Sequence, residues 1–297
     1  MDQNKPRLIL HVGTPKTGTT TLQQSLNASQ SRLLSKGIFY PNIELHPRGR
    51  DSWIVHCLLK NDLDKLRKNI REIAAKARQI GAKQVVLSCE GIYTRFPNFS
   101  REAKEALREF EKHFTVTLWC IFREPVSFAM SLFSQPVKHA PCALSSCHGT
   151  SEPPEIVAEH PWFQERLNYK GFIQNIEGLF SSSVVLATQY EPGGTIEQAR
   201  SLLGVDAAIL CSAPDANVSL SALSVYLMRR LNRLTLKPKM HRKLVSIVKK
   251  MDKFLNKISP PLRASDAMKR KVQAVSQKSE EFLKKKFGIC WDEGLKS

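Results

Sequence analysis

The sequence lacks the long apolar run that a membrane-spanning segment requires. A helix that crosses a bilayer needs ~20 consecutive apolar residues, whereas the longest apolar stretches here, LWCIF and SVVLA, have the length of buried strands. The first predicted strand begins at about Arg7, which leaves no room for a signal peptide before it. The seven cysteines are odd in number and lack paired spacing, which is typical of a reducing compartment rather than a disulfide framework. We therefore expect a cytoplasmic protein.

Acidic side chains are scarce in the last quarter of the chain. The 297 residues have a formal net charge of +18, with 45 Lys and Arg against 27 Asp and Glu. From Arg229 to the end there are 20 basic and 6 acidic side chains, so most of the excess lies there. Such a tail favours an acidic glycan or a peripheral contact with an anionic membrane, and its alternative is a solvated lysine-rich helical face. Nucleic acid is not expected, because no nucleic-acid motif or basic patch interleaved with aromatic residues is present.

Short apolar runs alternate with longer amphipathic segments over most of the chain. Strands are predicted at 7–12, 38–41, 83–88, 115–122 and 183–188. Helices are predicted at 18–35, 51–60, 62–80, 100–113, 125–137, 161–180 and 194–203. Strands separated by helices of this length pair in parallel, which predicts a three-layer, P-loop-like α/β fold with a central parallel sheet flanked by helices.

The pattern becomes wholly helical near the C-terminus. Helices are predicted at 219–234, 240–258 and 266–287, with Pro238 and the pair Pro260-Pro261 as breaks. We expect residues 1–215 to form the α/β core and residues 216–297 to form a basic helical extension packed on the same domain. Residues 138–160 are the least regular stretch and are predicted to be a long loop.

The segment LILHVGTPKTGTTTLQ lacks the lysine of a nucleotide triphosphate loop. In G-x-x-x-x-G-K-[ST] a lysine follows the second glycine, but Thr19 follows Gly18 here and the lysine of the loop is Lys16. A strand that ends at Gly13 and a helix that begins near Gly18 would direct backbone N–H groups at one anion. The loop therefore favours a phosphate-like anion, held by backbone, threonine hydroxyls and Lys16, over a magnesium triphosphate.

Two motifs together resemble a known enzyme family. Pro15-Lys16-Thr17-Gly18-Thr19-Thr20 is similar to the 5′-phosphosulfate loop of sulfotransferases that use 3′-phosphoadenosine 5′-phosphosulfate (PAPS). Arg123, which follows a predicted strand, and Ser131, eight residues later in a predicted helix, are similar to that family's 3′-phosphate motif. The layout resembles bacterial members related to the carbohydrate-modifying group. The resemblance spans residues 7 to about 225 and implies PAPS as cofactor, no required metal, and a hydroxyl acceptor such as a carbohydrate.

The chain departs from the family pattern at two places. Phe128 and Ala129 stand where many members have a second arginine, and Thr21-Leu22-Gln23 lacks the aromatic residue of the steroid and phenol enzymes. The second departure argues against a small aromatic acceptor. Relatives have an Asn-x-Ser near the nucleotide, so the resemblance implies a cofactor-binding role for Asn217.

Sulfuryl transfer requires a cation at the leaving oxygen and a base for the acceptor hydroxyl. Lys16 is predicted to supply the cation. Glu90, at the end of a predicted strand, is the first candidate for the base, because a glutamate in a similar position serves so in glycan sulfotransferases; its alternative is a helix cap or an arginine partner. His56 is the rival base, with a core histidine as its alternative. His11, inside the first strand, is expected to be structural.

Two other functions fit these residues less well than sulfuryl transfer. A P-loop kinase or other nucleotide phosphotransferase is disfavoured by the missing lysine, and a non-enzymatic anion-binding protein leaves both phosphate motifs unexplained. Four histidine and cysteine residues lie in the predicted loop: His139, Cys142, Cys147 and His148. Their spacing in the sequence is wider than that of zinc-ligand pairs, so no metal is predicted.

Overall fold

The computed structural model describes residues 5–41, 51–140, 147–213, 220–234 and 237–291. The chain divides into two compact units. Met1–Arg123 and Lys170–Asn217 form the first, here called the sheet unit. Glu124–Tyr169 and Val218–Ser297 form the second, here called the helical unit. Residues 124–169 thus group with the C-terminal helices, and the expected domains at 1–215 and 216–297 stay a prediction.

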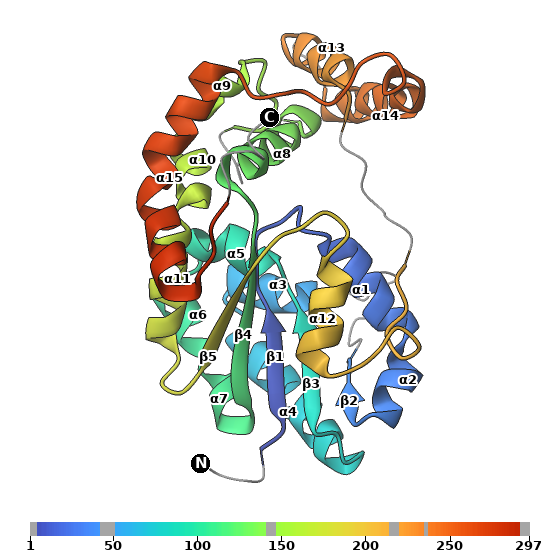
Figure 1. The fold of residues 1–297 in the computed structure, drawn as a ribbon, viewed down its shortest axis with the longest axis vertical. Helices are drawn as coiled ribbons and strands as arrows, with labels where there is room; N and C mark the ends of the chain where they lie inside the picture. Colours follow the sequence, from blue (N-terminus) through green and yellow to red (C-terminus); the bar gives the residue numbers. More distant parts are fainter. Residues whose placement is uncertain (1–4, 42–50, 141–146, 214–219, 235–236, 292–297) are drawn as a thin grey trace. The chain divides into compact units, whose positions relative to one another are not determined.

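The sheet unit contains a five-stranded parallel sheet in the order β2-β3-β1-β4-β5 (Figure 1). Its strands are β1 (Arg7–His11), β2 (Ile38–Phe39), β3 (Gln84–Ser88), β4 (Thr115–Phe122) and β5 (Val184–Gln189). All five lie at the predicted places, and the predicted parallel α/β architecture is confirmed. The register aligns Ile9 with Val86 on one side and with Thr117 on the other.

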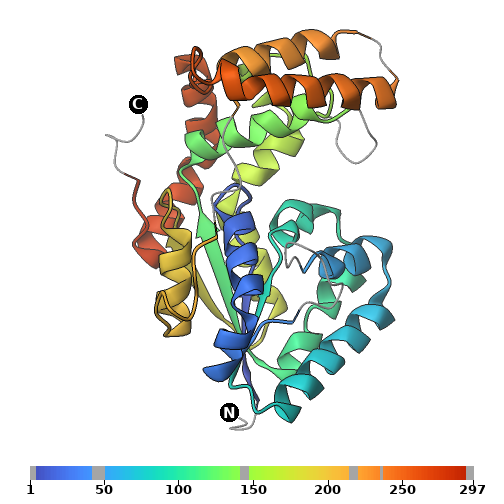
Figure 2. The same ribbon diagram turned by 90° about the vertical axis from the view of Figure 1, so that its right-hand side faces the viewer.

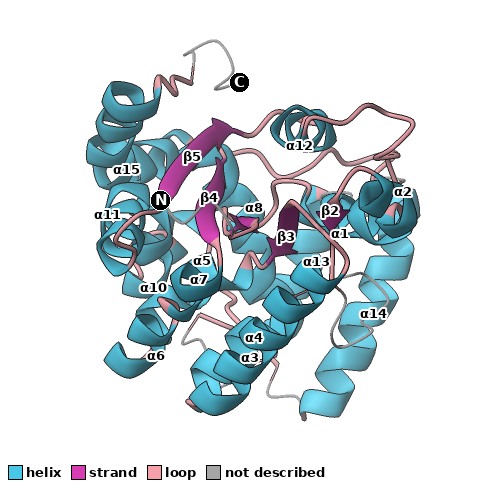
Figure 3. Ribbon diagram, turned by 90° about the horizontal axis from the view of Figure 1, so that it is seen from below, coloured by secondary structure: helices cyan, strands magenta, loops and turns pink. Residues whose placement is uncertain are grey.

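Helices flank both faces of this sheet; α12 and α4 lie on opposite sides of it (Figure 3). The α-helices of the unit are α1 (Thr19–Ala28), α2 (Gln30–Ser35), α3 (Ser52–Lys60), α4 (Leu63–Gln79), α5 (Gly91–Arg95), α6 (Arg101–Ala106), α7 (Glu109–His113), α11 (Tyr169–Leu179) and α12 (Thr195–Leu203), with one 3₁₀ turn, η1 (Phe96–Asn98). Alternate strand residues such as Ile9 and Ile121 pack against Leu22 of α1 and Ile196 of α12 in one buried cluster. Successive side chains of a strand point to opposite faces, so the intervening residues pack on the other layer.

Some predicted helices are divided in the structure. The predicted helix at 18–35 is α1 followed by α2, with the buried Ser29 between them at φ −104° and ψ 8°. The predicted helix at 161–180 is α10 (Pro161–Gln164), the 3₁₀ turn η2 (Glu165–Leu167) and α11. The predicted loop at 138–160 contains a short helix, α9 (Pro154–Val157), which begins at a proline suited to the first helical position.

The helical unit is built from α8 (Pro125–Lys138), α9, α10, α13 (Ala222–Asn232), α14 (Pro238–Leu255) and α15 (Asp266–Phe287). Helix α15 packs on α8 and α9, and α13 packs on α14. Tyr169 lies between Phe128 and Trp291 in an aromatic cluster, with ring centroids 6.0 and 6.4 Å apart.

Within the described parts of the chain, no helix is both long and apolar enough to cross a membrane.

Candidate functional site

The predicted anion loop lies at the carboxyl end of β1. Strand β1 lies between β3 and β4 in the sheet. The chain leaves β1 toward the edge formed by β2 and leaves β4 toward the opposite edge, formed by β5. Ligands of open α/β sheets bind beyond the carboxyl ends of the strands at such a switch point. The pairing with β4 continues into the loop, because the backbone N–H of Thr14 donates to the carbonyl oxygen of Ile121 at 3.0 Å.

Both glycines of the loop are required by their surroundings. A Cβ atom on Gly13 would lie 2.4 Å from the backbone nitrogen of Ile121, which no side chain can accommodate without movement of the backbone. Gly18 has a φ of +74°, and a Cβ there would lie 2.9 Å from Oγ1 of Thr195. The left-handed backbone and this close approach explain why glycine stands at the start of α1.

Buried threonines hold the loop in place. Oγ1 of Thr14 donates to the carbonyl oxygen of Ile121 at 3.0 Å, and Oγ1 of Thr17 donates to the carbonyl oxygen of Thr14 at 2.7 Å. From α12, Oγ1 of Thr195 donates to the carbonyl oxygen of Thr17 at 2.7 Å. All three side chains are buried. Sequence reasoning missed Thr195, because nothing in its local sequence indicates a partner almost 180 positions away.

The N-terminus of α1 is not capped by a side chain. Gly18 occupies the N-cap position, and no side-chain hydrogen bond caps the helix there. The first turn of a helix leaves backbone N–H groups without intrahelical partners and has a partial positive charge. Thr19 is buried and Thr20 is half-buried in this turn. The arrangement is suited to an anion that accepts hydrogen bonds from backbone N–H groups.

Lys16 and Arg123, predicted to serve different phosphates of one nucleotide, meet through the backbone of the loop. Lys16 is half-buried and has a φ of +68°, which is uncommon for a residue with a side chain. Its carbonyl oxygen accepts a hydrogen bond of 3.0 Å from Nη1 of Arg123. The guanidinium of Arg123 also lies over the ring of Tyr190, 5.3 Å from its centroid. Arg123 therefore supports the loop and places a fixed positive charge beside it.

The two candidate bases lie on different elements of the sheet unit. Glu90 is half-buried and occupies the N-cap position of α5, two residues after β3 ends, but its side chain does not cap that helix. His56 is exposed on α3, so the core-histidine interpretation is wrong. Its neighbours Trp53, Val55 and Cys57 are buried, which shows that the apolar face of α3 is turned inward and His56 outward.

A buried carboxylate that sequence reasoning missed lies at the carboxyl end of β3. Asp51 is 1% exposed, and its Oδ2 accepts a hydrogen bond of 2.6 Å from the backbone N–H of Ser88. Its charge adds to burial in raising the pKa of Tyr40 and of Cys89. Nothing in the local sequence indicates this burial, because it depends on the contact of Asp51 with Ser88, 37 positions further along the chain.

His11 is buried inside the sheet, as expected for a structural residue. Its Nδ1 lies 2.9 Å from Oγ of Ser88, to which Nε2 of Gln23 also donates at 3.3 Å. Desolvation lowers the pKa of His11 to about 3. The imidazole is therefore neutral near pH ~7 and belongs to the network that joins β1, β3 and α1.

Ser131 lies in the helical unit, in the second turn of α8, where it is half-buried. Helix α8 begins at Pro125, as predicted, and Glu124 caps it by accepting hydrogen bonds from the backbone N–H groups of Val126 and Ser127 at 2.9 and 2.6 Å. The start of α8 thus has its own carboxylate, unlike the start of α1. Asn217 falls outside the described residues.

The remaining sequence candidates do not form a metal site where the structure describes them. His139 and His148 stack with ring centroids 5.1 Å apart. Cys142 lies outside the described residues. Among the residues that are described, no three His, Cys, Asp or Glu side chains group so as to hold a metal ion.

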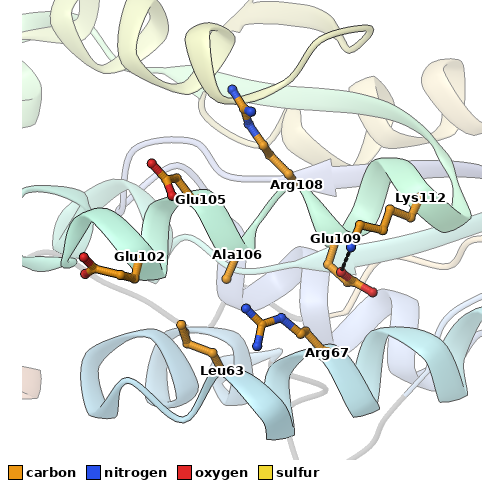
Figure 4. Close-up of a pocket in the computed structure, with 8 residues that line it drawn as sticks. All are labelled: Leu63, Arg67, Glu102, Glu105, Ala106, Arg108, Glu109 and Lys112. Carbon is orange, nitrogen blue, oxygen red and sulfur yellow. Dashed lines mark hydrogen bonds and ion pairs between the residues drawn. The ribbon is translucent and has the colours of Figure 1, made fainter.

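A pocket of about 280 Å³ lies elsewhere in the sheet unit (Figure 4). It is lined by Leu63, Arg67, Glu102, Glu105, Ala106, Arg108, Glu109 and Lys112. These residues come from α4, from α6 and α7, and from Arg108, which lies between those two helices. Lys112 and Glu109 pair at 2.7 Å. The pocket includes no predicted site residue.

Comparison with protein-family models finds none that matches this chain, and a search of curated proteins finds no match. The interpretation of the site therefore depends on its residues and geometry.

Proposed function

We propose that the protein is a PAPS-dependent sulfotransferase that transfers a sulfuryl group to an acceptor hydroxyl. The observation that supports this most directly is the 3.0 Å hydrogen bond between Arg123 and the backbone of Lys16. It couples the two sequence motifs that resemble the phosphate sites of that family. The position of the loop at a switch point of a parallel sheet, and the uncapped start of α1, agree with a P-loop-like site for an anion.

In this proposal the loop binds the 5′-phosphosulfate. The segment from Pro15 to Thr20, including Thr17 and Gly18, wraps the 5′-phosphate, and backbone N–H groups and the hydroxyls of Thr19 and Thr20 donate to it. Arg123, Ser131 and Asn217 bind the 3′-phosphate side of the nucleotide. No metal is required, because positive charge comes from the protein.

The reaction is a direct in-line transfer. The acceptor oxygen attacks sulfur, and the bond between sulfur and the bridging oxygen breaks. The bridging oxygen leaves with 3′,5′-diphosphoadenosine, and the proton of the acceptor hydroxyl passes to the base. Lys16 stabilises the negative charge that develops on the bridging oxygen, a contribution of the kind whose removal costs on the order of 10²-fold in turnover. Glu90 is the first candidate for the base and His56 the second.

The acceptor that best fits the family resemblance is a carbohydrate, and the compartment that fits the cysteine pattern is the cytoplasm. The basic C-terminal helices would favour an anionic glycan as acceptor or as an adjacent polymer.

A nucleotide phosphotransferase is the second candidate. Glu90 follows β3, which is a direct neighbour of β1, so a carboxylate that could organise magnesium is present near the carboxyl edge of the sheet. Thr19 stands where that class of enzyme has its lysine, which weighs against it. The choice of nucleotide separates the two candidates.

The test is a comparison of thermal unfolding with two ligands. We expect 3′,5′-diphosphoadenosine without magnesium to raise the Tm by mass action, and ATP with magnesium to have little effect. The opposite preference would refute the sulfotransferase. Incubation with PAPS labelled in its sulfuryl group and a panel of hydroxyl acceptors then measures transfer. Lys16→Ala should abolish most of it, whereas Lys36→Ala, an exposed lysine after α2, should not.

A further inference from the structure

Helix α14 already has a buried face, which explains how it folds. Four residues at successive turns of the helix are buried: His241, Val245, Val248 and Asp252. Asp252 accepts hydrogen bonds from the backbone N–H and Oγ of Ser221 at 3.0 and 2.7 Å, which fixes the helix to the start of α13. The two helices lie side by side in both views and form most of their contacts with each other (Figures 1 and 2).

A second apolar face of the same helix is exposed. Eleven large apolar side chains are exposed in the described part of the chain, and five of them belong to this helix and the turn that follows it. They are Met240, Ile247, Met251, Phe254 and Ile258, which are 51%, 45%, 46%, 72% and 75% exposed. Their spacing of seven, four, three and four residues aligns them in one row along the helix. Single exposed apolar residues are ordinary, but a continuous row marks an interaction surface.

The rest of the exposed surface of α14 has one sign of charge. The exposed basic residues are Lys239, Arg242, Lys243, Lys249, Lys250, Lys253 and Lys257. At 100° per residue they lie on the side of the apolar row away from the buried face. The one acidic residue between 237 and 258 is Asp252, which is buried against Ser221. The helix therefore exposes an apolar stripe beside a stripe whose charged side chains are all basic. The two stripes together are here called the α14 surface, and the helix is about 27 Å long.

We propose that the α14 surface binds an anionic lipid bilayer. A soluble polyanion, such as an acidic glycan or a nucleic acid, would use the lysines but would leave Phe254 and Ile258 in water. A second copy of the chain would bring two basic stripes together, with no exposed acidic side chain of α14 to offset their repulsion. An anionic bilayer matches both stripes, because apolar side chains enter the boundary between headgroups and acyl chains while lysines contact lipid phosphates and carboxylates.

The helix would lie parallel to the membrane rather than cross it. Lysine side chains extend their apolar stems along such a surface and keep the ammonium group at the headgroups. The binding is peripheral and does not depend on the proposed transfer reaction. It would bring the enzyme, whatever its reaction, to substrates at an anionic membrane surface.

The test is sedimentation of the full-length protein with lipid vesicles. We expect the protein to bind vesicles of phosphatidylcholine mixed with phosphatidylserine and not vesicles of phosphatidylcholine alone. The paired variant Phe254→Ser/Ile258→Ser should weaken binding about tenfold or more, because both side chains would enter the bilayer. The control Leu34→Ser/Leu59→Ser removes two exposed apolar side chains from the sheet unit and should leave binding unchanged.

The contribution of the α14 lysines is tested by the same sedimentation measurement. Lys250→Glu/Lys257→Glu should weaken binding about tenfold or more, whereas Lys65→Glu/Lys76→Glu on α4 alters the net charge equally and should have little effect. All four pairs change exposed residues, and circular dichroism checks that each variant is folded. Three results would overturn the proposal. These are no binding to either vesicle, equal binding to both, and loss of binding in the lysine pair alone, which would indicate a surface for soluble polyanions.

Discussion

Nη1 of Arg123 donates a hydrogen bond to the carbonyl oxygen of Lys16, at 3.0 Å. The bond joins the residue that follows β4 to the middle of the loop that follows β1. Because Lys16 has a left-handed backbone at φ +68°, the loop conformation is costly by itself and needs support from its neighbours. Arg123 provides part of that support as well as charge.

Removal of the Arg123 guanidinium should therefore weaken nucleotide binding. We expect Arg123→Ala to raise the Kd of 3′,5′-diphosphoadenosine roughly 10-fold or more, since a hydrogen bond to a charged group contributes about 1.5–3 kcal/mol. Titration calorimetry measures the Kd. Arg101→Ala, which removes an arginine whose side chain is 87% exposed on α6, is the matched control. An unchanged Kd for Arg123→Ala would exclude Arg123 from the nucleotide site.

The choice of base can be tested by a pair of variants. If Glu90 accepts the proton of the acceptor, Glu90→Gln should lower turnover by about 10²-fold or more with little change in nucleotide binding. His56→Ala should then be nearly as active as the parent, which agrees with its exposed position on α3. Turnover with labelled PAPS and the best acceptor gives the comparison. Loss of activity in His56→Ala alone would reverse the assignment.

Gly13 should tolerate substitution much less well than a glycine in open space. A Cβ at Gly13 would lie 2.4 Å from the backbone of Ile121, so Gly13→Ala should lower the free energy of unfolding by about 1–3 kcal/mol or more. A Cβ at Gly178, within α11, meets nothing within 4 Å. Gly178→Ala should leave that free energy unchanged or raise it by up to about 1 kcal/mol. Urea unfolding measures both, and equal effects would contradict the packing described for the loop.

His11 should make the fold less stable as the pH falls. Its pKa in the fold is about 3, below the usual value of 6.5, because burial disfavours the charged form. Between these two values the unfolded chain binds a proton that the folded chain does not, so stability falls with decreasing pH by up to about 1.4 kcal/mol per pH unit. The contribution is absent above about 6.5.

Urea unfolding at several pH values between about 7 and 5 tests this contribution. His11→Gln, which cannot titrate there, should show a shallower loss of stability on acidification than the parent protein. His56→Gln on the exposed side of α3 serves as the control and should follow the parent. An unchanged pH dependence in His11→Gln would show that His11 does not cause the loss.

Much of the fold follows from local sequence. The five strands are short apolar runs of the right length, and α4 repeats its buried residues at helical spacing between Asp62, which caps it, and Gly81. Such patterns depend on neighbours within a few positions and can be predicted without tertiary contacts. The division of the segment 18–35 at the buried Ser29 was not predicted from these local patterns.

For the candidate site, the sequence by itself indicated the loop after β1, the position of Lys16 inside that loop, and Arg123 directly after β4. It could not determine that Arg123 supports the backbone of Lys16, that Thr195 ties α12 to Thr17, or that Asp51 is buried at the end of β3. Each of these contacts joins residues far apart in the chain, which the pairing of strands and the packing of the connecting segments bring together. Local patterns set which elements form, whereas the order of the strands decides which side chains meet.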